Sequence, residues 1–242
     1  MKRFIKNLNS ISTIGIVNKI RPKVILQNVE SIYKSPVEMK LPIPSSEIGS
    51  LTTLEASMLI STLKIFKPKV VFEYGTFLGY STSIFLKNTS KDCKVFSIDL
   101  GKDFNCDELN NVDSNKILLN DETNDNYLRI IQSKSGPIYI KNDIDKENKK
   151  LELIYGDSTK MSIPSIGLED KVNFVFVDGG HSYDIIKSDT ENALKMVKKG
   201  IIIWHDYNSK IHGDVTKFVD EFAVTKKVFH IENTMLAFHI VD

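Results

Sequence analysis

Five short apolar runs, each ending at or within two residues of a glycine or an acidic residue, constrain the fold of this chain more than any other sequence feature. The runs have the length of β-strands and lie at residues 70–74, 94–99, 151–155, 172–178 and 201–204. Between several of them the apolar residues change to helical spacing, most clearly over residues 182–199. Strands that alternate with helices predict a parallel sheet with helices on both faces. The sequence therefore predicts a doubly wound α/β fold.

The two ends of this region carry further signals. Thr52 and Glu55 have the spacing of a capping box, and apolar residues at helical spacing follow, so we expect a helix at about residues 52–66. After the fifth strand, a helical pattern leads to two short apolar segments, residues 228–231 and 235–240, with a turn between them. These segments predict an antiparallel hairpin that closes one edge of a mostly parallel sheet.

The length of 242 residues favours one domain with additions. We expect an N-terminal extension over residues 1–45 and the α/β domain over residues 46–242, with an insertion at about residues 101–150. The insertion is rich in Asn, Asp and Lys, is longer than an ordinary loop, and carries a short helical pattern at residues 127–132. It is expected to form either a lid or a partly disordered surface loop.

The N-terminal extension combines basic residues with scattered isoleucines. Its longest apolar stretch, residues 14–17, is too short for a signal peptide or a transmembrane segment. We expect the extension to pack on the domain or on a second subunit, as in a homodimer. The alternative is that it lies on an anionic membrane surface.

Composition argues against several classes of protein. With 32 Lys and Arg residues against 31 Asp and Glu residues, the formal charge is +1, which gives no electrostatic reason to expect nucleic acid as a partner. Cys93 and Cys106 are too few for a zinc site or a disulfide scaffold, so a cytoplasmic location is expected. These features favour a small molecule or a neutral polymer as the substrate.

The first chemical signal follows the first strand. Gly75 and Gly79 lie where an open α/β sheet forms its ligand crevice, and glycine lets the backbone turn tightly and approach a ligand. Asp99 ends the next strand, where its carboxylate is placed to accept both hydroxyl protons of a ribose. Together they predict a site for a nucleoside-containing ligand. The alternative is ordinary strand-to-helix turn chemistry.

The segment from Glu73 to Ser81, Glu-Tyr-Gly-Thr-Phe-Leu-Gly-Tyr-Ser, resembles the first motif of class I S-adenosylmethionine-dependent methyltransferases, and of catechol O-methyltransferase in particular. Residues 177–183 and 200–207 resemble the methyltransferase-24 group of that class. The resemblance implies a Rossmann-like sheet of seven strands and S-adenosylmethionine as the cofactor. It also implies the residues that bind this cofactor: Glu73, Gly75, Thr76, Phe77, Gly79, Ser81, Asp99, Asp157, Ser158 and Asp178.

Asp178 and Asp206 each close a predicted parallel strand, so both carboxylates are expected to face one crevice. Such a pair can hold a hard cation such as Mg²⁺, and the alternative is that both cap the following backbone. The resemblance implies that the ion binds the acceptor oxygen, with His205 in place of a missing third ligand. It also places the catalytic base at His181, because imidazole titrates near neutrality, as a general base should.

Two positions depart from the family pattern: a single Gly200 stands where a glycine pair is usual, and Tyr207 stands where catechol enzymes carry an amide metal ligand. The predicted function is methyl transfer to a hydroxyl of a small molecule or sugar, in polysaccharide or secondary-metabolite synthesis, with His181 and Asp178 as catalytic residues. The alternatives are a non-catalytic binding protein and an NAD-dependent oxidoreductase, although the chain lacks the Gly-x-Gly-x-x-Gly motif. No chemical role is assigned to the remaining histidines, His212, His230 and His239.

Overall fold

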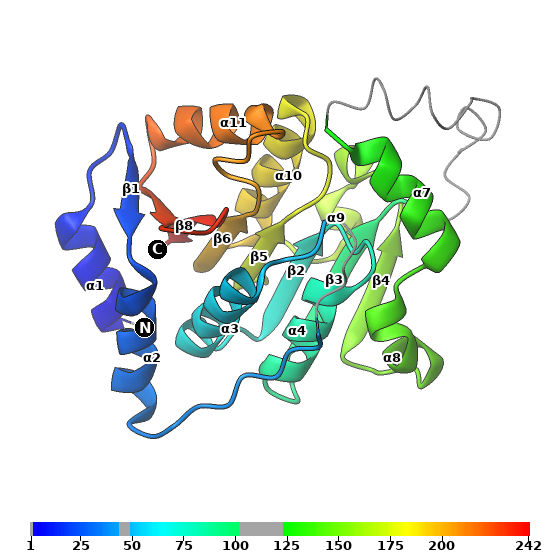
Figure 1. The fold of residues 1–242 in the computed structure, drawn as a ribbon, viewed down its shortest axis with the longest axis horizontal. Helices are drawn as coiled ribbons and strands as arrows, with labels where there is room; N and C mark the ends of the chain where they lie inside the picture. Colours follow the sequence, from blue (N-terminus) through cyan, green and yellow to red (C-terminus); the bar gives the residue numbers. More distant parts are fainter. Residues whose placement is uncertain (1, 44–48, 102–122) are drawn as a thin grey trace.

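The computed structural model describes residues 2–43, 49–101 and 123–242, and the strands of this part form one eight-stranded sheet (Figure 1). The strand order is β1-β7-β8-β6-β5-β2-β3-β4, and within the described ranges only β8 runs antiparallel to its neighbours. The α/β class and the antiparallel hairpin are thereby confirmed. The strands are β1 Val17–Ile20, β2 Val70–Tyr74, β3 Lys94–Asp99, β4 Leu151–Tyr155, β5 Phe174–Val177, β6 Gly200–Trp204, β7 Val228–Ile231 and β8 Ala237–Val241.

Helices cover both faces of the sheet, as expected for a doubly wound fold. Side chains of α1 to α4 belong to the hydrophobic core on one face, and side chains of α9 to α11 belong to the core on the other. α7 and α8 lie on the β4 side of the molecule (Figure 1). The helices are α1 Lys2–Ile11, α2 Pro22–Tyr33, α3 Thr53–Phe66, α4 Tyr80–Asn88, α7 Asp125–Ser135, α8 Lys141–Asp145, α9 Ile163–Ile166, α10 Tyr183–Met196 and α11 Gly213–Ala223, with 3₁₀ helices η1 Ile138–Ile140 and η2 Ser158–Lys160.

The central strand β5 shows why the apolar runs are continuous rather than alternating. Successive side chains of a strand point to opposite faces. Phe174 and Phe176 therefore join the core that α3 and α4 cover, whereas Val175 and Val177 join the core that α10 and α11 cover. All four are buried. A strand buried on both faces has no solvent side to mark with polar residues.

The predicted capping box at the start of α3 is confirmed. The Thr52 hydroxyl accepts a hydrogen bond from the Glu55 backbone N–H at 3.3 Å, and the Glu55 carboxylate accepts one from the Thr52 N–H at 2.8 Å. The second Glu55 oxygen accepts the N–H of Met235, also at 2.8 Å. Glu55 therefore also ties α3 to the turn between β7 and β8.

The prediction of seven strands is wrong, because the N-terminal segment contributes an eighth. β1 pairs in parallel with β7, from Val17 opposite Val228 to Ile20 opposite Ile231. The strand has only four residues, Val-Asn-Lys-Ile, and two of them are polar, so its sequence carries no strand signal. Phe4 and Leu8 of α1 are buried in the core. The N-terminal segment thus packs on the sheet, one of the arrangements that the sequence left open.

The strand order changes direction at β2, because β3 pairs on one side of it and β5 on the other. The carboxyl ends of strands at such a switch point form the ligand crevice of an open α/β sheet. The helical pattern predicted at residues 127–132 falls within α7. The expected boundary near residue 45, the first part of the insertion and Cys106 lie outside the described residues.

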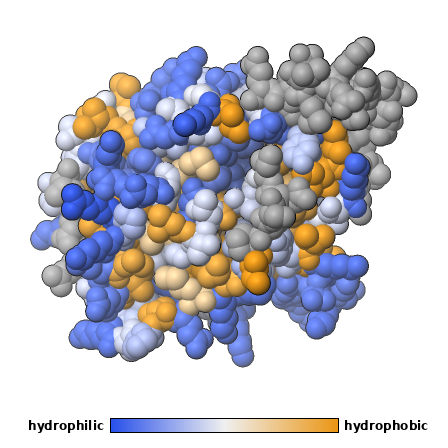
Figure 2. Space-filling view, in the orientation of Figure 1, coloured by the Kyte–Doolittle hydropathy of each residue, from blue (hydrophilic) through white to orange (hydrophobic). Residues whose placement is uncertain are grey.

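Hydrophilic and hydrophobic residues are interspersed on the face drawn in Figure 2. Among the residues that the structure describes, no helix is both long and apolar enough to cross a membrane.

Candidate functional site

A cavity of about 630 Å³ lies at the carboxyl ends of β2, β3, β5 and β6, at the switch point of the sheet. Most of the predicted site residues line it. Glu73 and Gly79 are not part of its wall. The predicted residues that line the cavity are Gly75, Thr76, Phe77, Ser81, Asp99, Asp157, Ser158, Asp178, His181, His205 and Asp206.

Gly75 begins the loop between β2 and α4, which forms one end of the cavity. Its φ is +90°, a conformation that side chains disfavour. A Cβ added at this position would lie 2.0 Å from the carbonyl oxygen of Asp178. The glycine is therefore required by the close approach of the loop after β5, a contact within the protein that the sequence did not reveal.

Asp99, at the end of β3, orders the same loop. One carboxylate oxygen accepts the backbone N–H of Phe77 at 2.6 Å, and the other accepts the N–H of Leu100 at 2.7 Å. Burial raises the pKa of Asp99, and the hydrogen bond from Phe77 opposes that rise. Because each oxygen can accept more than one hydrogen bond, the carboxylate is still able to bind hydroxyl groups from the cavity.

Glu73 lies beneath this loop and is fully buried. Its carboxylate accepts hydrogen bonds from the hydroxyls of Ser81, Thr82 and Ser97, the last two at 2.5 and 2.6 Å. Burial raises the pKa of Glu73 to about 8, although the three hydroxyls act against the rise. Glu73 thus holds the start of α4 against the sheet. Because Glu73 does not line the cavity, it would influence a bound ligand indirectly, by positioning the loop above it.

Two further predicted residues line the cavity where β4 ends. Asp157 accepts the backbone N–H of Thr159 at 3.0 Å and so caps η2. The hydrogen bond from the Thr159 side chain lowers the pKa of Asp157, which keeps it ionised. Ser158 follows on the same wall.

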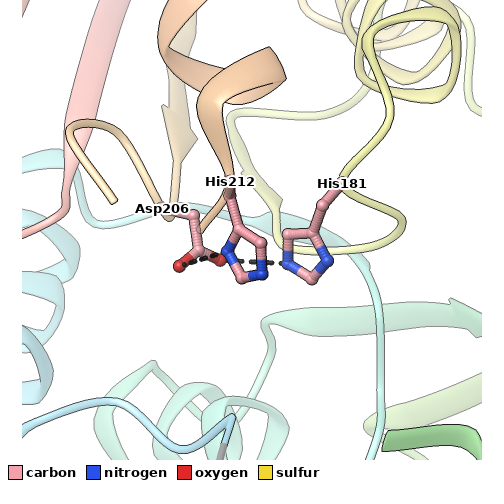
Figure 3. A group of neighbouring side chains, drawn as sticks. All are labelled: His181, Asp206 and His212. Atoms are coloured by element: carbon pink, nitrogen blue, oxygen red, sulfur yellow. Dashed lines mark hydrogen bonds and ion pairs between the residues drawn. The ribbon is translucent and has the colours of Figure 1, made fainter. Parts of the chain in front are cut away.

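The wall of the cavity also holds two carboxylates and three imidazoles: Asp178, His181, His205, Asp206 and His212. We call these five residues the acid–histidine cluster. Asp206 lies at its centre. One of its oxygens lies 3.0 Å from His181 Nε2 and 3.1 Å from His205 Nδ1, and the other lies 3.0 Å from His212 Nδ1. Figure 3 shows both the His181 and the His212 rings directed at this carboxylate. The three imidazoles hold the pKa of Asp206 well below its usual value in spite of burial.

His181 is held between two carboxylates. Its Nδ1 lies 2.5 Å from Asp125 of α7, and its Nε2 faces Asp206. Burial acts to lower the pKa of this imidazole, but the two carboxylates raise it to about 10. In this arrangement the ring is a cation at neutral pH, which differs from the near-neutral titration that the sequence suggested.

His205 lies between Asp178 and Asp206, with its Nδ1 3.1 Å from an oxygen of each. Its Nε2 has no hydrogen-bond partner among the residues that the structure describes, and it lies 3.7 Å from a carboxylate oxygen of Glu55. Burial opposes the charge on this ring, but Asp178 and Asp206 raise its pKa well above the ordinary value. The predicted set of Asp178, His205 and Asp206 thus lies together, with the spacing of metal ligands.

Two residues that contact His181 at this site, His212 and Asp125, were missed by the sequence. His212 stacks on His181 with ring centroids 3.8 Å apart and planes inclined by 11°. It lies six residues after Asp206, and this closeness in sequence to a predicted ligand was the one signal that pointed to it. Asp125 comes from the insertion, where no sequence pattern indicates a contact with His181.

The reversal of strand order at β2, the glycine loop beside it and the antiparallel last strand define the class I methyltransferase fold. Residues 72–207, more than half of the chain, match the family model described as a methyltransferase domain, and the chain belongs to this methyltransferase family. No curated protein matches the chain.

Two solved structures are similar in fold at low sequence identity. An O-methyltransferase from Bacillus cereus in complex with S-adenosylhomocysteine is 16% identical, with a TM-score of 0.54 over 91% of this chain and 90% of that chain. A Podospora anserina methyltransferase bound to S-adenosylhomocysteine is 14% identical, with a TM-score of 0.54 over 99% of this chain and 93% of that chain. At such identities the similarity establishes the shared fold.

Proposed function

We propose that this chain transfers the methyl group of S-adenosylmethionine to a hydroxyl oxygen of a small molecule or sugar. The observation that carries this proposal is that one cavity is lined both by the glycine loop with Asp99 and by the acid–histidine cluster. The loop and Asp99 match the donor motif, and the cluster offers groups that bind and deprotonate a hydroxyl. Two proteins of the same fold were solved with the demethylated donor, S-adenosylhomocysteine.

Replacing Asp99 with alanine should weaken binding of S-adenosylhomocysteine by about 1.5–3 kcal/mol, because charge-assisted hydrogen bonds to the ribose are lost. Asp99→Asn keeps one acceptor oxygen, for the N–H of Phe77 or of Leu100 but not for both, and removes the charge; it serves as the comparison variant, with a smaller loss than Asp99→Ala. Isothermal calorimetry on the purified chain measures both. Binding of NAD, with no binding of S-adenosylmethionine or S-adenosylhomocysteine, would instead favour an oxidoreductase. Binding of S-adenosylmethionine without methylation of any acceptor would favour a non-catalytic protein.

We propose that Asp178 and His181, in the acid–histidine cluster, act on the acceptor, and that His181 receives the proton of the acceptor hydroxyl. This role requires a neutral ring with a free lone pair. Because Asp125 and Asp206 hold His181 as a cation, the ring must first release one proton to solvent, and the acceptor must replace one of these two contacts, before the hydroxyl proton moves to the ring. Asp125 belongs to α7 of the insertion. We therefore propose that the position of this helix determines how much of His181 is in the neutral form that accepts a proton.

The pH dependence tests the role of Asp125. The neutral form of His181 is present above its pKa, and the negative charge of Asp125 raises that pKa. Asp125→Asn removes the charge, so the rising limb of kcat against pH should move to lower pH. Asp143→Asn in α8 is the matched control and should leave the limb unmoved. An unshifted limb in Asp125→Asn would show that another group titrates in the reaction.

Asp178, His205 and Asp206 are the residues that would hold a divalent cation. They fit such an ion, because a single imidazole nitrogen, Nδ1 of His205, faces the partly buried carboxylate of Asp178 and the buried carboxylate of Asp206 and can donate only one N–H to the two. When bound, such an ion binds the acceptor oxygen and favours its deprotonated form. We also propose a cytoplasmic location, which the buried free thiol of Cys93 supports.

A further inference from the structure

Each carboxylate on the described wall of the cavity already has a partner within the protein. Asp99 accepts two backbone N–H groups, and Asp157 caps η2. Asp125, Asp178 and Asp206 each contact a histidine of the acid–histidine cluster. The negative charges of this wall are therefore compensated before any acceptor binds, and they do not require an acceptor that brings a positive charge.

Apart from the histidines, the wall has two basic side chains, Arg129 and Lys210. Neither makes an ion pair or a side-chain hydrogen bond with any residue that the structure describes. Arg129 lies on α7 and is half-buried, whereas Lys210 is exposed in the loop after β6. A guanidinium that is partly removed from water without an anionic partner is unfavourable, and an anionic ligand in the cavity would compensate its charge.

Both cations lie next to residues that contact His181. Arg129 follows Asp125 by four residues, so their side chains share one face of α7. Burial acts to raise the pKa of Asp125, but the hydrogen bond from His181 and the charge of Arg129 hold it below its ordinary value. Lys210 lies two residues before His212, whose ring stacks on His181. The proposed base therefore lies between a helix that supplies one cation and a loop that supplies the other.

The chemistry of these two side chains suits a carboxylate or a phosphate. A guanidinium presents a planar fork of N–H donors that matches either group, and an ammonium binds either group as a point charge. The sulfonium of S-adenosylmethionine brings a further positive charge into the same cavity, and this charge also favours a negatively charged acceptor.

We propose that the acceptor carries a carboxylate or phosphate group in addition to the hydroxyl that is methylated, and that Arg129 and Lys210 bind this anionic group. The inference rests on the proposed function, because it takes His181 as the group that receives the hydroxyl proton. It names the chemical class of the acceptor, an anionic hydroxy compound such as a sugar acid or a sugar phosphate. One helix, α7, then both binds the acceptor and contacts the base.

Binding of glucose, glucuronic acid and glucose 6-phosphate to the purified full chain tests this class. The chain is saturated with S-adenosylhomocysteine, saturation-transfer NMR compares the three sugars, and a chelator keeps free metal ions from binding the anions. We expect at least one of the two anionic sugars to bind about tenfold or more tightly than glucose, because its hydrogen bonds are charge-assisted. Tighter binding of glucuronic acid identifies a carboxylate as the anionic group, and tighter binding of glucose 6-phosphate identifies a phosphate.

Arg129→Gln should weaken binding of the preferred anionic sugar by at least about tenfold, because a charge-assisted hydrogen bond is lost from a half-buried site. Lys210→Gln should weaken it by about two- to fivefold, the range for an exposed ion pair. Lys134→Gln is the matched control, because Lys134 is an exposed cation in the last turn of α7 that does not line the cavity. It should leave sugar binding unchanged. Calorimetry on S-adenosylhomocysteine should show little change in all three variants.

Glucose that binds as tightly as both anionic sugars, no binding of either anionic sugar, or anionic-sugar binding that is unchanged in both Arg129→Gln and Lys210→Gln would each overturn the inference. An equal loss of S-adenosylhomocysteine binding in Arg129→Gln would assign this cation to the carboxylate of the donor, and would overturn the inference as well. Absence of S-adenosylhomocysteine binding to the wild type would instead contradict the proposed function, so the two failures are distinguishable.

Discussion

Replacing His181 with alanine should lower kcat by about 10²–10⁴-fold at the pH where the wild type is fastest, the usual contribution of a general base. A sugar-type hydroxyl is a poor nucleophile until its proton leaves, and His181 lies on the cavity wall beside Asp178 and Asp206. The affinity for S-adenosylmethionine should change little, because this donor is expected to lie over Gly75 and Asp99. Steady-state kinetics together with calorimetry on S-adenosylhomocysteine measure the two effects separately.

His230→Ala is the control for this substitution. His230 is also a buried histidine, but it lies on β7 and bonds the carbonyl of Thr234. It should affect stability while leaving kcat of the folded enzyme near the wild-type value. A His181→Ala enzyme with wild-type kcat would place the base elsewhere, and Asp178 would be the next candidate.

Replacing Gly75 with alanine should be among the most damaging small changes to this fold. The new Cβ would lie 2.0 Å from the Asp178 carbonyl oxygen, and φ at this position is +90°. Strain of this kind costs about 1–3 kcal/mol, which corresponds to a fall in Tm of about 2–12 °C for a domain of this size. Because the loop must shift, binding of S-adenosylhomocysteine should also weaken. Thermal unfolding and calorimetry check the two results.

Gly213→Ala is the matched control for that substitution. Gly213 begins α11, and a Cβ there would meet no atom of the described residues within 4 Å. Its effect on the free energy of unfolding should stay within about 0.5 kcal/mol. If Gly75→Ala proved as stable as Gly213→Ala, the loop after β5 would have to be free to move away from Gly75.

The sequence predicted the central part of the fold well for a physical reason. Strands buried on both faces, such as β5, are continuous apolar runs, and such runs are rare outside a parallel sheet. The capping box of Thr52 and Glu55 marked the start of α3 because it is a local interaction. β1 was missed because it has only four residues, two of them the polar Asn18 and Lys19. It is a strand because it pairs with β7, which lies more than 200 residues away in the sequence.

At the site, too, the residues on predicted strands could be identified from the sequence, whereas the residues that reach the site through long-range contacts could not. Asp99, Asp178 and Asp206 were found because the ends of parallel strands meet at one edge of the sheet. Asp125 and His212 come from segments outside the strands, and only the folded chain brings them to His181. The raised pKa of His181 could not be predicted from the sequence either, because it depends on two carboxylates, Asp125 and Asp206, that are distant in sequence.

The pairing of β1 with β7 also bears on strand addition at the border of the sheet. An unpaired strand at the border of a sheet offers its backbone groups to other chains. Without β1, that border would be β7, Val228–Ile231, whose side chains are apolar except for His230. β1 replaces it with an equally short border strand that carries Lys19, a charged strand of the kind that discourages strand addition. The N-terminal segment is therefore expected to discourage edge-to-edge aggregation at the border remote from the cavity.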